Sequence, residues 1–370
     1  MADKIGKPVK TLEGLRHITG QGRFVADIKL PNTLFCRFIR STYPHAILKS
    51  VEGPASARIF TWRDLEKIAT PFKIEIPLRG VKPHHLHYLA CDKVRYVGEP
   101  VAMLLSEDPY ILADLAEEVV VDYEPLKPVS DVESALADGA PLLYEDWGSN
   151  VAASLDYRVG DPESMLSSSP LVLEKSFHIG RVTPAPLEPR AILAYFDRGT
   201  GILTVYISNQ APHVERALLS QAIGIPENRV RVITPDVGGA FGQKCLLYPE
   251  DVAVCIASIL TGRPVKYVES RGENLTASSH AREQHHQVKI GVKRDGEIQA
   301  IIDRIKTDIG AGILYPHSSI GTSIVAASML PGPYRFQHYR AEILCVATNK
   351  CPFGAYRGLA NPKQLSLWRD

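Results

Sequence analysis

Two stretches of alternating apolar residues, separated by one helical stretch, most constrain how this chain can fold. Residues 203–207 alternate Leu, Val and Ile with polar residues and predict a strand that ends near Gln210. Residues 212–223 follow helical spacing and end at Gly224, and residues 229–233 predict the next strand. A strand–helix–strand unit of this length favours two parallel strands that lie side by side.

A glycine-rich turn, Gly238–Gly242, follows the second of these strands. Gln210 and this turn then lie at the same edge of the sheet, at the carboxyl ends of its strands, where α/β sheets usually bind ligands. Glycine permits positive φ and close approach of the backbone to a ligand, and successive N–H groups can bind an anion. The spacing fits equally well a tight strand-to-helix turn without a ligand. The glycine-rich turn is not a Walker A loop, because Gln243 stands before Lys244 where that motif has glycine. It also does not match the G-x-G-x-x-G motif.

The remaining pattern predicts an α+β (mixed α/β) protein with two α/β halves. Ser106 or Asp108 is placed to cap a helix that begins at Pro109, and a later helix begins at Pro249 and ends at Gly262. Further strands are expected at 34–39, 46–51, 101–105 and 118–123, and a hairpin over 286–302. We expect a tail at 1–19, a first domain at 20–145, a linker at 146–170 and a second domain at 171–370.

Composition narrows the functional classes. Lys and Arg number 42 and Asp and Glu 41, giving a formal charge of +1, which argues against a domain dominated by nucleic-acid binding. No apolar run of about 18 residues predicts a membrane span, the first ten residues lack a secretory apolar region, and we expect a cytoplasmic protein. Without any C-x-x-C, the six cysteines are expected to be buried free thiols: Cys36, Cys91, Cys245, Cys255, Cys345 and Cys351.

Three further groups of polar residues carry weaker signals. Arg357 stands between small residues in Gly354–Gly358 and either clamps a carboxylate or oxyanion, or is a solvated surface residue. The opposite charges of Glu188 and Arg190 favour a surface or interdomain ion pair. Two histidine groups match no zinc spacing: one, in a predicted loop, comprises His84, His85 and His87, and the other comprises His280, His285 and His286.

Ten short phrases, in order along residues 20–370, resemble one known family. They are Gly22–Asp27, Phe38–Ser41, His45–Ala46, Val97–Ala102, Val121–Leu126, Leu187–Arg190, Asn209–His213, Gly238–Lys244, Gly262–Lys266 and Ala355–Gly358. The chain resembles the N-terminal part of the large subunit of molybdenum hydroxylases, the xanthine dehydrogenase, aldehyde oxidase and carbon monoxide dehydrogenase family. This resemblance implies an a/b hammerhead domain followed by the first part of a molybdopterin-binding domain.

The resemblance also implies roles for individual residues. The cofactor would be a molybdenum-pterin, either molybdopterin or its cytidine dinucleotide, bound by Gln210 and by Gly239, Ala240, Phe241 and Gly242. Gln210 and the Phe241 backbone would lie near molybdenum oxygens, as oriented donors that contribute electrostatically to catalysis. Arg357 and Cys245 would line the substrate pocket. No catalytic residue is expected in this chain, because the family's general base lies in a C-terminal continuation that this sequence does not contain.

The implied activity is hydroxylation of an aldehyde or N-heterocycle with oxygen from water, hydride passing to molybdenum and electrons to partner subunits. The expected partners are a chain with the second half of the molybdenum domain, a [2Fe–2S] subunit, an FAD subunit and a small-molecule substrate. Two departures bear on the substrate: Gly358 replaces the copper-ligand Cys of carbon monoxide dehydrogenases, and Cys245 replaces the substrate-binding Glu of xanthine dehydrogenases. A paralogue that docks to such subunits without cofactor, and a carbon monoxide dehydrogenase-like protein lacking the copper ligand, are the alternatives.

Overall fold

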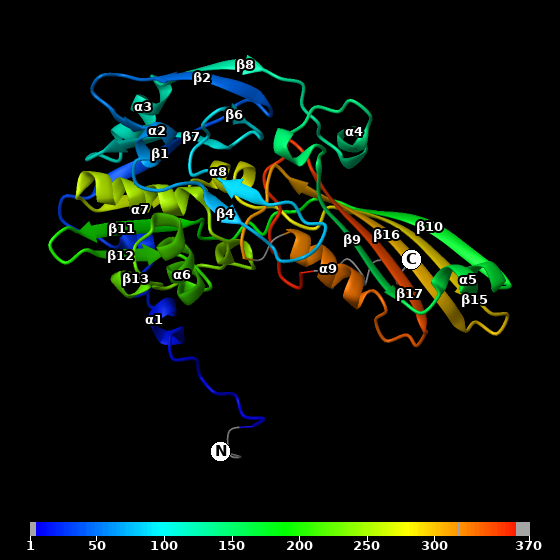
Figure 1. The fold of residues 1–370 in the computed structure, drawn as a ribbon. Coiled ribbons are helices and arrows are strands. Elements are labelled where there is room, and N and C mark those ends of the chain that lie inside the picture. Colours follow the sequence, from blue (N-terminus) through cyan, green and yellow to red (C-terminus); the bar gives the residue numbers. More distant parts are fainter. Residues whose placement is uncertain (1–4, 317–318, 360–370) are drawn as a thin grey trace.

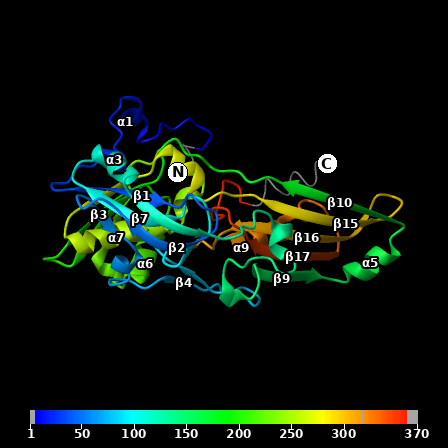
Figure 2. The same cartoon turned by 90° about the horizontal axis from the view of Figure 1, so that it is seen from above.

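The chain folds around two large sheets that extend side by side (Figures 1 and 2). The computed structural model describes residues 5–316 and 319–359. The first sheet has seven strands, in spatial order β13 (Val230–Ile233), β12 (Ile202–Ile207), β11 (Ala191–Asp197), β14 (Val265–Val268), β1 (Leu34–Arg40), β7 (Pro100–Ser106) and β3 (Arg58–Phe60).

Strands from both halves of the sequence share this first sheet. β1 pairs in parallel with β14, with Leu34 opposite Val265, so the sheet is continuous across the two halves. At its edge, β12 and β13 are parallel, with Leu203 opposite Val230, which confirms the predicted strand–helix–strand unit. The intervening helix is α6 (Pro212–Ile223), which ends at Gly224 with a φ of 76°.

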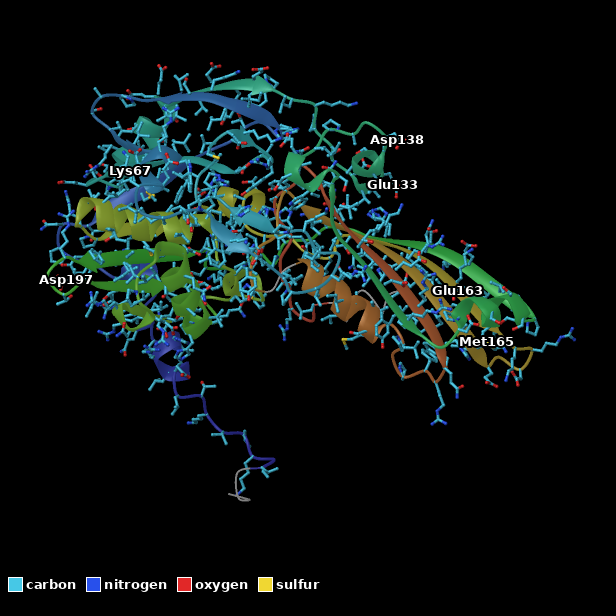
Figure 3. The ribbon with its side chains drawn as sticks, viewed as in Figure 1. Lys67, Glu133, Asp138, Glu163, Met165 and Asp197 are labelled. Atoms are coloured by element: carbon cyan, nitrogen blue, oxygen red, sulfur yellow. The ribbon has the colours of Figure 1, made fainter. Side chains whose placement is uncertain are left out.

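The second sheet has five strands, in the order β10 (Leu171–Ile179), β15 (Gln284–Val292), β16 (Ile298–Gly310), β17 (His338–Ala347) and β9 (Val151–Val159). β15 and β16 form the predicted antiparallel hairpin. α5 (Pro162–Ser168) carries Glu163 and Met165 at the far end of this sheet (Figure 3), and Glu163 accepts a hydrogen bond from Arg340 at 2.7 Å. The range 146–170 thus contains a paired strand and a helix, and the proposed division into domains stays a prediction.

Helix α7 (Pro249–Thr261) lies at the centre of the core. Its residues 252–257 are 0% exposed, and it packs on β11 and β14, while α6 contacts both α7 and β13. Pro249 occupies the first turn, where its missing N–H is not needed, and Gly262 ends the helix with a φ of 67°. These limits match those expected. The helix expected from Pro109 instead begins at Ile111, because the Asp108 side chain accepts the Tyr110 N–H at 2.8 Å in a turn before it.

Two small sheets complete the N-terminal half. They comprise β6 (Lys93–Val94), β2 (Ala46–Glu52) and β8 (Val120–Pro125) in one, and β4 (Phe72–Ile74) with β5 (His84–Leu86) in the other. The remaining helices are α1 (Gly14–Ile18), α2 (Trp62–Leu65), α3 (Ile111–Glu117), α4 (Val132–Leu136), α8 (Arg271–Thr276) and α9 (Ser319–Met329). Glu133 of α4, labelled in Figure 3, bonds Lys306 of β16 at 2.8 Å and so ties α4 to the second sheet.

Three expectations about individual residues are corrected. His84 begins strand β5 and is buried, whereas the sequence placed it in a loop. Cys91 is exposed and Cys245 is half-buried, while the other four thiols are buried and all six are free. Among the residues that the structure describes, no helix is long and apolar enough to cross a membrane.

Candidate active site

The structure brings Gln210 and the glycine turn into direct contact. Gln210 lies three residues beyond β12, and its side-chain carbonyl accepts the Gly242 N–H at 2.8 Å. Its backbone N–H donates to the Lys244 carbonyl at 2.9 Å. The amide nitrogen of the Gln210 side chain therefore remains available as a donor at this edge of the sheet.

The turn holds its backbone in conformations that L-residues rarely adopt. Gly239, Phe241 and Gly242 have φ values of 95°, 55° and 103°. A Cβ on Gly242 would lie 2.8 Å from the Ala355 carbonyl oxygen, so only glycine fits there without displacing that chain. The Phe241 ring is 40% exposed. Across residues 5–316 and 319–359, the Ala240 and Phe241 N–H groups have no hydrogen-bond partner, which leaves two backbone donors beside Gln210.

The two residues expected in the substrate pocket border the same turn. The Arg357 N–H donates to the Phe241 carbonyl at 2.8 Å, and the Arg357 side chain is exposed. The Cys245 thiol donates to the Gly242 carbonyl at 2.9 Å. Burial raises the pKa of Cys245 to about 11, so its thiol is protonated at neutral pH and acts as a small neutral wall rather than a nucleophile.

Glu188 anchors the glycine turn through hydrogen bonds, a role that the sequence did not indicate. One Glu188 oxygen accepts the Gly238 N–H at 2.7 Å, the Ser208 hydroxyl at 2.7 Å and the Lys244 ammonium at 2.8 Å. The Lys244 side chain is 0% exposed and that of Glu188 is 16% exposed. Burial lowers the pKa of Lys244, against the opposing effect of Glu188. This ion pair therefore fixes the first glycine of the turn and the residue that binds the Gln210 backbone.

The expected surface or interdomain ion pair at Glu188 and Arg190 is wrong, because each forms its ion pair within the second half of the chain. Arg190 is buried and bonds Glu269 at 2.8 Å, and its guanidinium lies 3.7 Å from the centroid of the Tyr248 ring. Glu269 and the Gln243 side chain share the amide nitrogen of Asn274, at 2.8 and 3.0 Å. A buried chain of hydrogen bonds thus runs from Arg190 to the residue that follows the glycine turn. Its members are far apart in sequence, so no local pattern could have found it.

Two family models match the chain. The molybdopterin cofactor-binding domain matches residues 143–367, and the a/b hammerhead domain of aldehyde oxidase and xanthine dehydrogenase matches residues 19–127. The chain belongs to the xanthine dehydrogenase and aldehyde oxidase family of molybdopterin-binding proteins. The predicted fold, a hammerhead domain followed by part of a molybdopterin-binding domain, is confirmed.

Relatives within this family are about 30% identical to the chain over the aligned residues. The nicotine 6-hydroxylase large subunit of Paenarthrobacter nicotinovorans is 32% identical over 96% of this chain and 44% of its own length. The nicotinate dehydrogenase large molybdopterin subunit of Eubacterium barkeri is 30% identical over 97% of this chain and 82% of its own length. The chain therefore spans about half the length of the first relative and most of the second.

A solved structure of the family has the same fold. Quinoline 2-oxidoreductase from Pseudomonas putida 86 superposes with a TM-score of 0.93 at 31% identity, over 97% of this chain and 46% of that one. The residues of the glycine turn fit a group with acceptor atoms, because they offer two backbone N–H donors and the Gln210 amide nitrogen, beside a Gly242 position that a Cβ would crowd. Gln210, Ala240 and Phe241 are the residues that carry these donors.

Proposed function

We propose that this chain supplies one wall of the active site of a molybdenum hydroxylase that oxidises an aldehyde or an N-heterocycle with oxygen from water. The observation that carries the proposal is the 2.8 Å hydrogen bond between Gln210 and Gly242, which unites a side-chain amide and a bent backbone at the end of two parallel strands. When bound, the molybdenum-pterin would supply the two-electron redox chemistry that no side chain provides.

The residues of this chain contribute binding and orientation. The Gln210 amide and the Phe241 N–H are hydrogen-bond donors whose positions are fixed before the substrate arrives. The hydrogen bonds of Glu188 to Gly238 and Lys244 hold the turn in place. Such preorganised donors stabilise negative charge that develops in the transition state. The Arg357 guanidinium, exposed beside the turn, is placed to bind a polar or anionic group of the substrate. The neutral Cys245 thiol favours an uncharged substrate edge beside it.

Partner subunits complete the proposal. We place the general base on a chain carrying the second half of the molybdenum domain, and [2Fe–2S] and FAD on two further subunits. Gly358, with a φ of 84°, offers no thiol for a copper ion, so a carbon monoxide dehydrogenase-like activity is not favoured. The proposal includes assembly in the cytoplasm.

The test is expression with the neighbouring reading frames, followed by mass spectrometry of molybdenum and pterin in the purified complex. Metal that appears only with a partner chain supports the proposal, whereas a stable complex without metal supports the cofactor-free alternative. In the loaded complex, Gln210→Ala should lower turnover of an aldehyde or N-heterocycle about 10²-fold, the loss seen when one oriented donor is removed. Gln221→Ala, an exposed glutamine on α6, is the matched control. Equal turnover of the two variants at full molybdenum occupancy would reject the role of Gln210.

A further inference from the structure

A second cavity lies away from the glycine turn, between strand β5 and the start of helix α7. Its volume is about 330 Å³, within the lower range of pockets that bind small molecules. Its floor is made of buried residues, including His84, Trp147 and Gly312. Exposed residues, among them His85 and Glu145, line its mouth. A solute can therefore enter from solvent and reach a buried floor.

Aromatic rings form one wall of this cavity. The centroids of the Tyr144 and Trp147 rings are 4.5 Å apart, and the His84 imidazole meets Tyr144 edge-on with centroids 5.1 Å apart. Arg95 lies over the Tyr144 ring at 4.8 Å and stiffens it from one side. Rigid aromatic walls of this kind favour a flat ligand, because stacking and edge contacts both need planar partners.

The cavity contains one buried polar group without a partner. The indole N–H of Trp147 donates to the Pro83 carbonyl at 2.9 Å, and the Tyr144 hydroxyl donates to the Ala311 carbonyl. In contrast, His84 is 4% exposed and its Nδ1 atom has no hydrogen-bond partner within the part of the chain that the structure describes. Burial, with a further contribution from Arg95, lowers the pKa of His84 to about 3, so the ring is neutral and offers one donor and one acceptor nitrogen.

Most charges around the cavity are paired or exposed to solvent: Asp92 lies 3.5 Å from Arg95, and Asp146 is exposed, where solvent screens its charge. Glu145 bonds Lys93 at 2.5 Å, and Glu250 bonds Arg40 at 2.8 Å. The Glu99 carboxylate accepts the backbone N–H of Arg95. Burial raises the pKa of Glu99 to about 7, so this carboxyl is partly protonated at neutral pH. The buried groups of the cavity without an ionic partner are therefore the neutral imidazole of His84 and the weakly acidic carboxyl of Glu99, and neither selects a charged ligand.

We propose that this cavity binds a planar, uncharged heteroaromatic molecule that carries a hydrogen-bond donor and an acceptor on one edge. The absence of a side chain at Gly312 keeps the floor open, since a Cβ there would lie 3.1 Å from Nε2 of His84. The site is separate from the glycine turn and does not depend on the proposed redox function.

The experiment uses isothermal titration calorimetry of the full chain with 1H-indazole, which has adjacent N and N–H groups, and with naphthalene, which has neither. For a ligand of this size we expect an indazole Kd of about 0.1–1 mM with one site per chain. Gly312→Leu should weaken binding at least about tenfold, because it fills the floor. Gly180→Leu, at a position where a Cβ would have no neighbour within 4 Å, should leave the Kd unchanged.

Two further variants locate the binding and its chemistry. His84→Phe keeps a ring of similar shape but removes the free nitrogen, so indazole should bind about tenfold more weakly while naphthalene binds as before. Arg357→Ala should change neither Kd, which separates this cavity from the candidate active site. Equal binding of indazole to wild type and Gly312→Leu, or loss of binding when the partner chain is present, would overturn the proposal. Circular dichroism of each variant checks that it folds.

Discussion

Replacing Glu188 by Gln tests whether a buried ion pair anchors the glycine turn. The substitution keeps the shape of the side chain and an acceptor oxygen, but it removes the negative charge beside the Lys244 ammonium, whose side chain is 0% exposed. Removing one partner of a buried pair costs about 3–5 kcal/mol. Lysine can limit this cost by releasing its proton. At pH 7, about 3.5 pH units below its ordinary pKa of 10.5, that release costs about 4.8 kcal/mol.

The pH dependence makes this prediction specific. In the variant the pKa of Lys244 falls further below its unfolded value, so the unfolded chain binds more protons and stability rises with pH. The penalty should therefore shrink from about 4 kcal/mol at pH 7 to about 2 kcal/mol at pH 9. Urea unfolding followed by circular dichroism at both pH values measures it. The double variant Glu188→Gln/Lys244→Met removes both partners and should recover most of the loss. A penalty below about 1 kcal/mol at pH 7, or one independent of pH, would refute the reasoning.

Two other substitutions probe the surroundings of the site. Gly242→Ala should destabilise the chain by about 1–3 kcal/mol more than Gly296→Ala. Both glycines have positive φ, but only a Cβ at Gly242 would lie 2.8 Å from a carbonyl oxygen. Equal losses of unfolding free energy in urea would show that the Ala355 backbone moves away and removes the clash. Burial alone would raise the pKa of Glu250, but Arg190 and Arg40 lower this pKa to about 2. The ionised carboxylate therefore stabilises the fold above pH 4.5, the ordinary pKa of the group, and this stabilisation is lost as the pH falls towards 2. Glu250→Gln should accordingly cost about 3 kcal/mol at pH 7 and little at pH 2, and an unfolding free energy that differs from wild type equally at both values would contradict this.

Local signals in the sequence located the frame of the site but not its support. Helix ends such as Pro212 with Gly224 and Pro249 with Gly262 define α6 and α7, because proline and glycine act through the backbone of a few residues. From these ends, adjacency of Gln210 and the turn followed by topology alone. The partners of Glu188 and Arg190 could not be read in this way, since they lie 20 to 88 positions away in the sequence. Two opposite charges two residues apart suggested a surface or interdomain pair, whereas each residue bonds buried partners within the second half of the chain.

The position of a strand in the order of the sheet was likewise not predictable from the sequence. The sequence predicted a strand at β1 but none at β14, and a strand pattern does not say which strand pairs with which. The cavity wall shows the same limit. His84, singled out only as part of a histidine group, becomes informative when Tyr144 and Trp147 are seen beside it, more than fifty positions along the chain.

The parallel pairing of β1 with β14 has a consequence for any attempt to divide the chain. A truncation between residues 145 and 171 would separate these two strands and leave each with an unpaired row of backbone N–H and C=O groups. Both pieces would then carry an apolar open edge of the kind that templates aggregation. Fragments made at that point should precipitate or recombine with one another, and a recombined pair would restore the seven-stranded sheet.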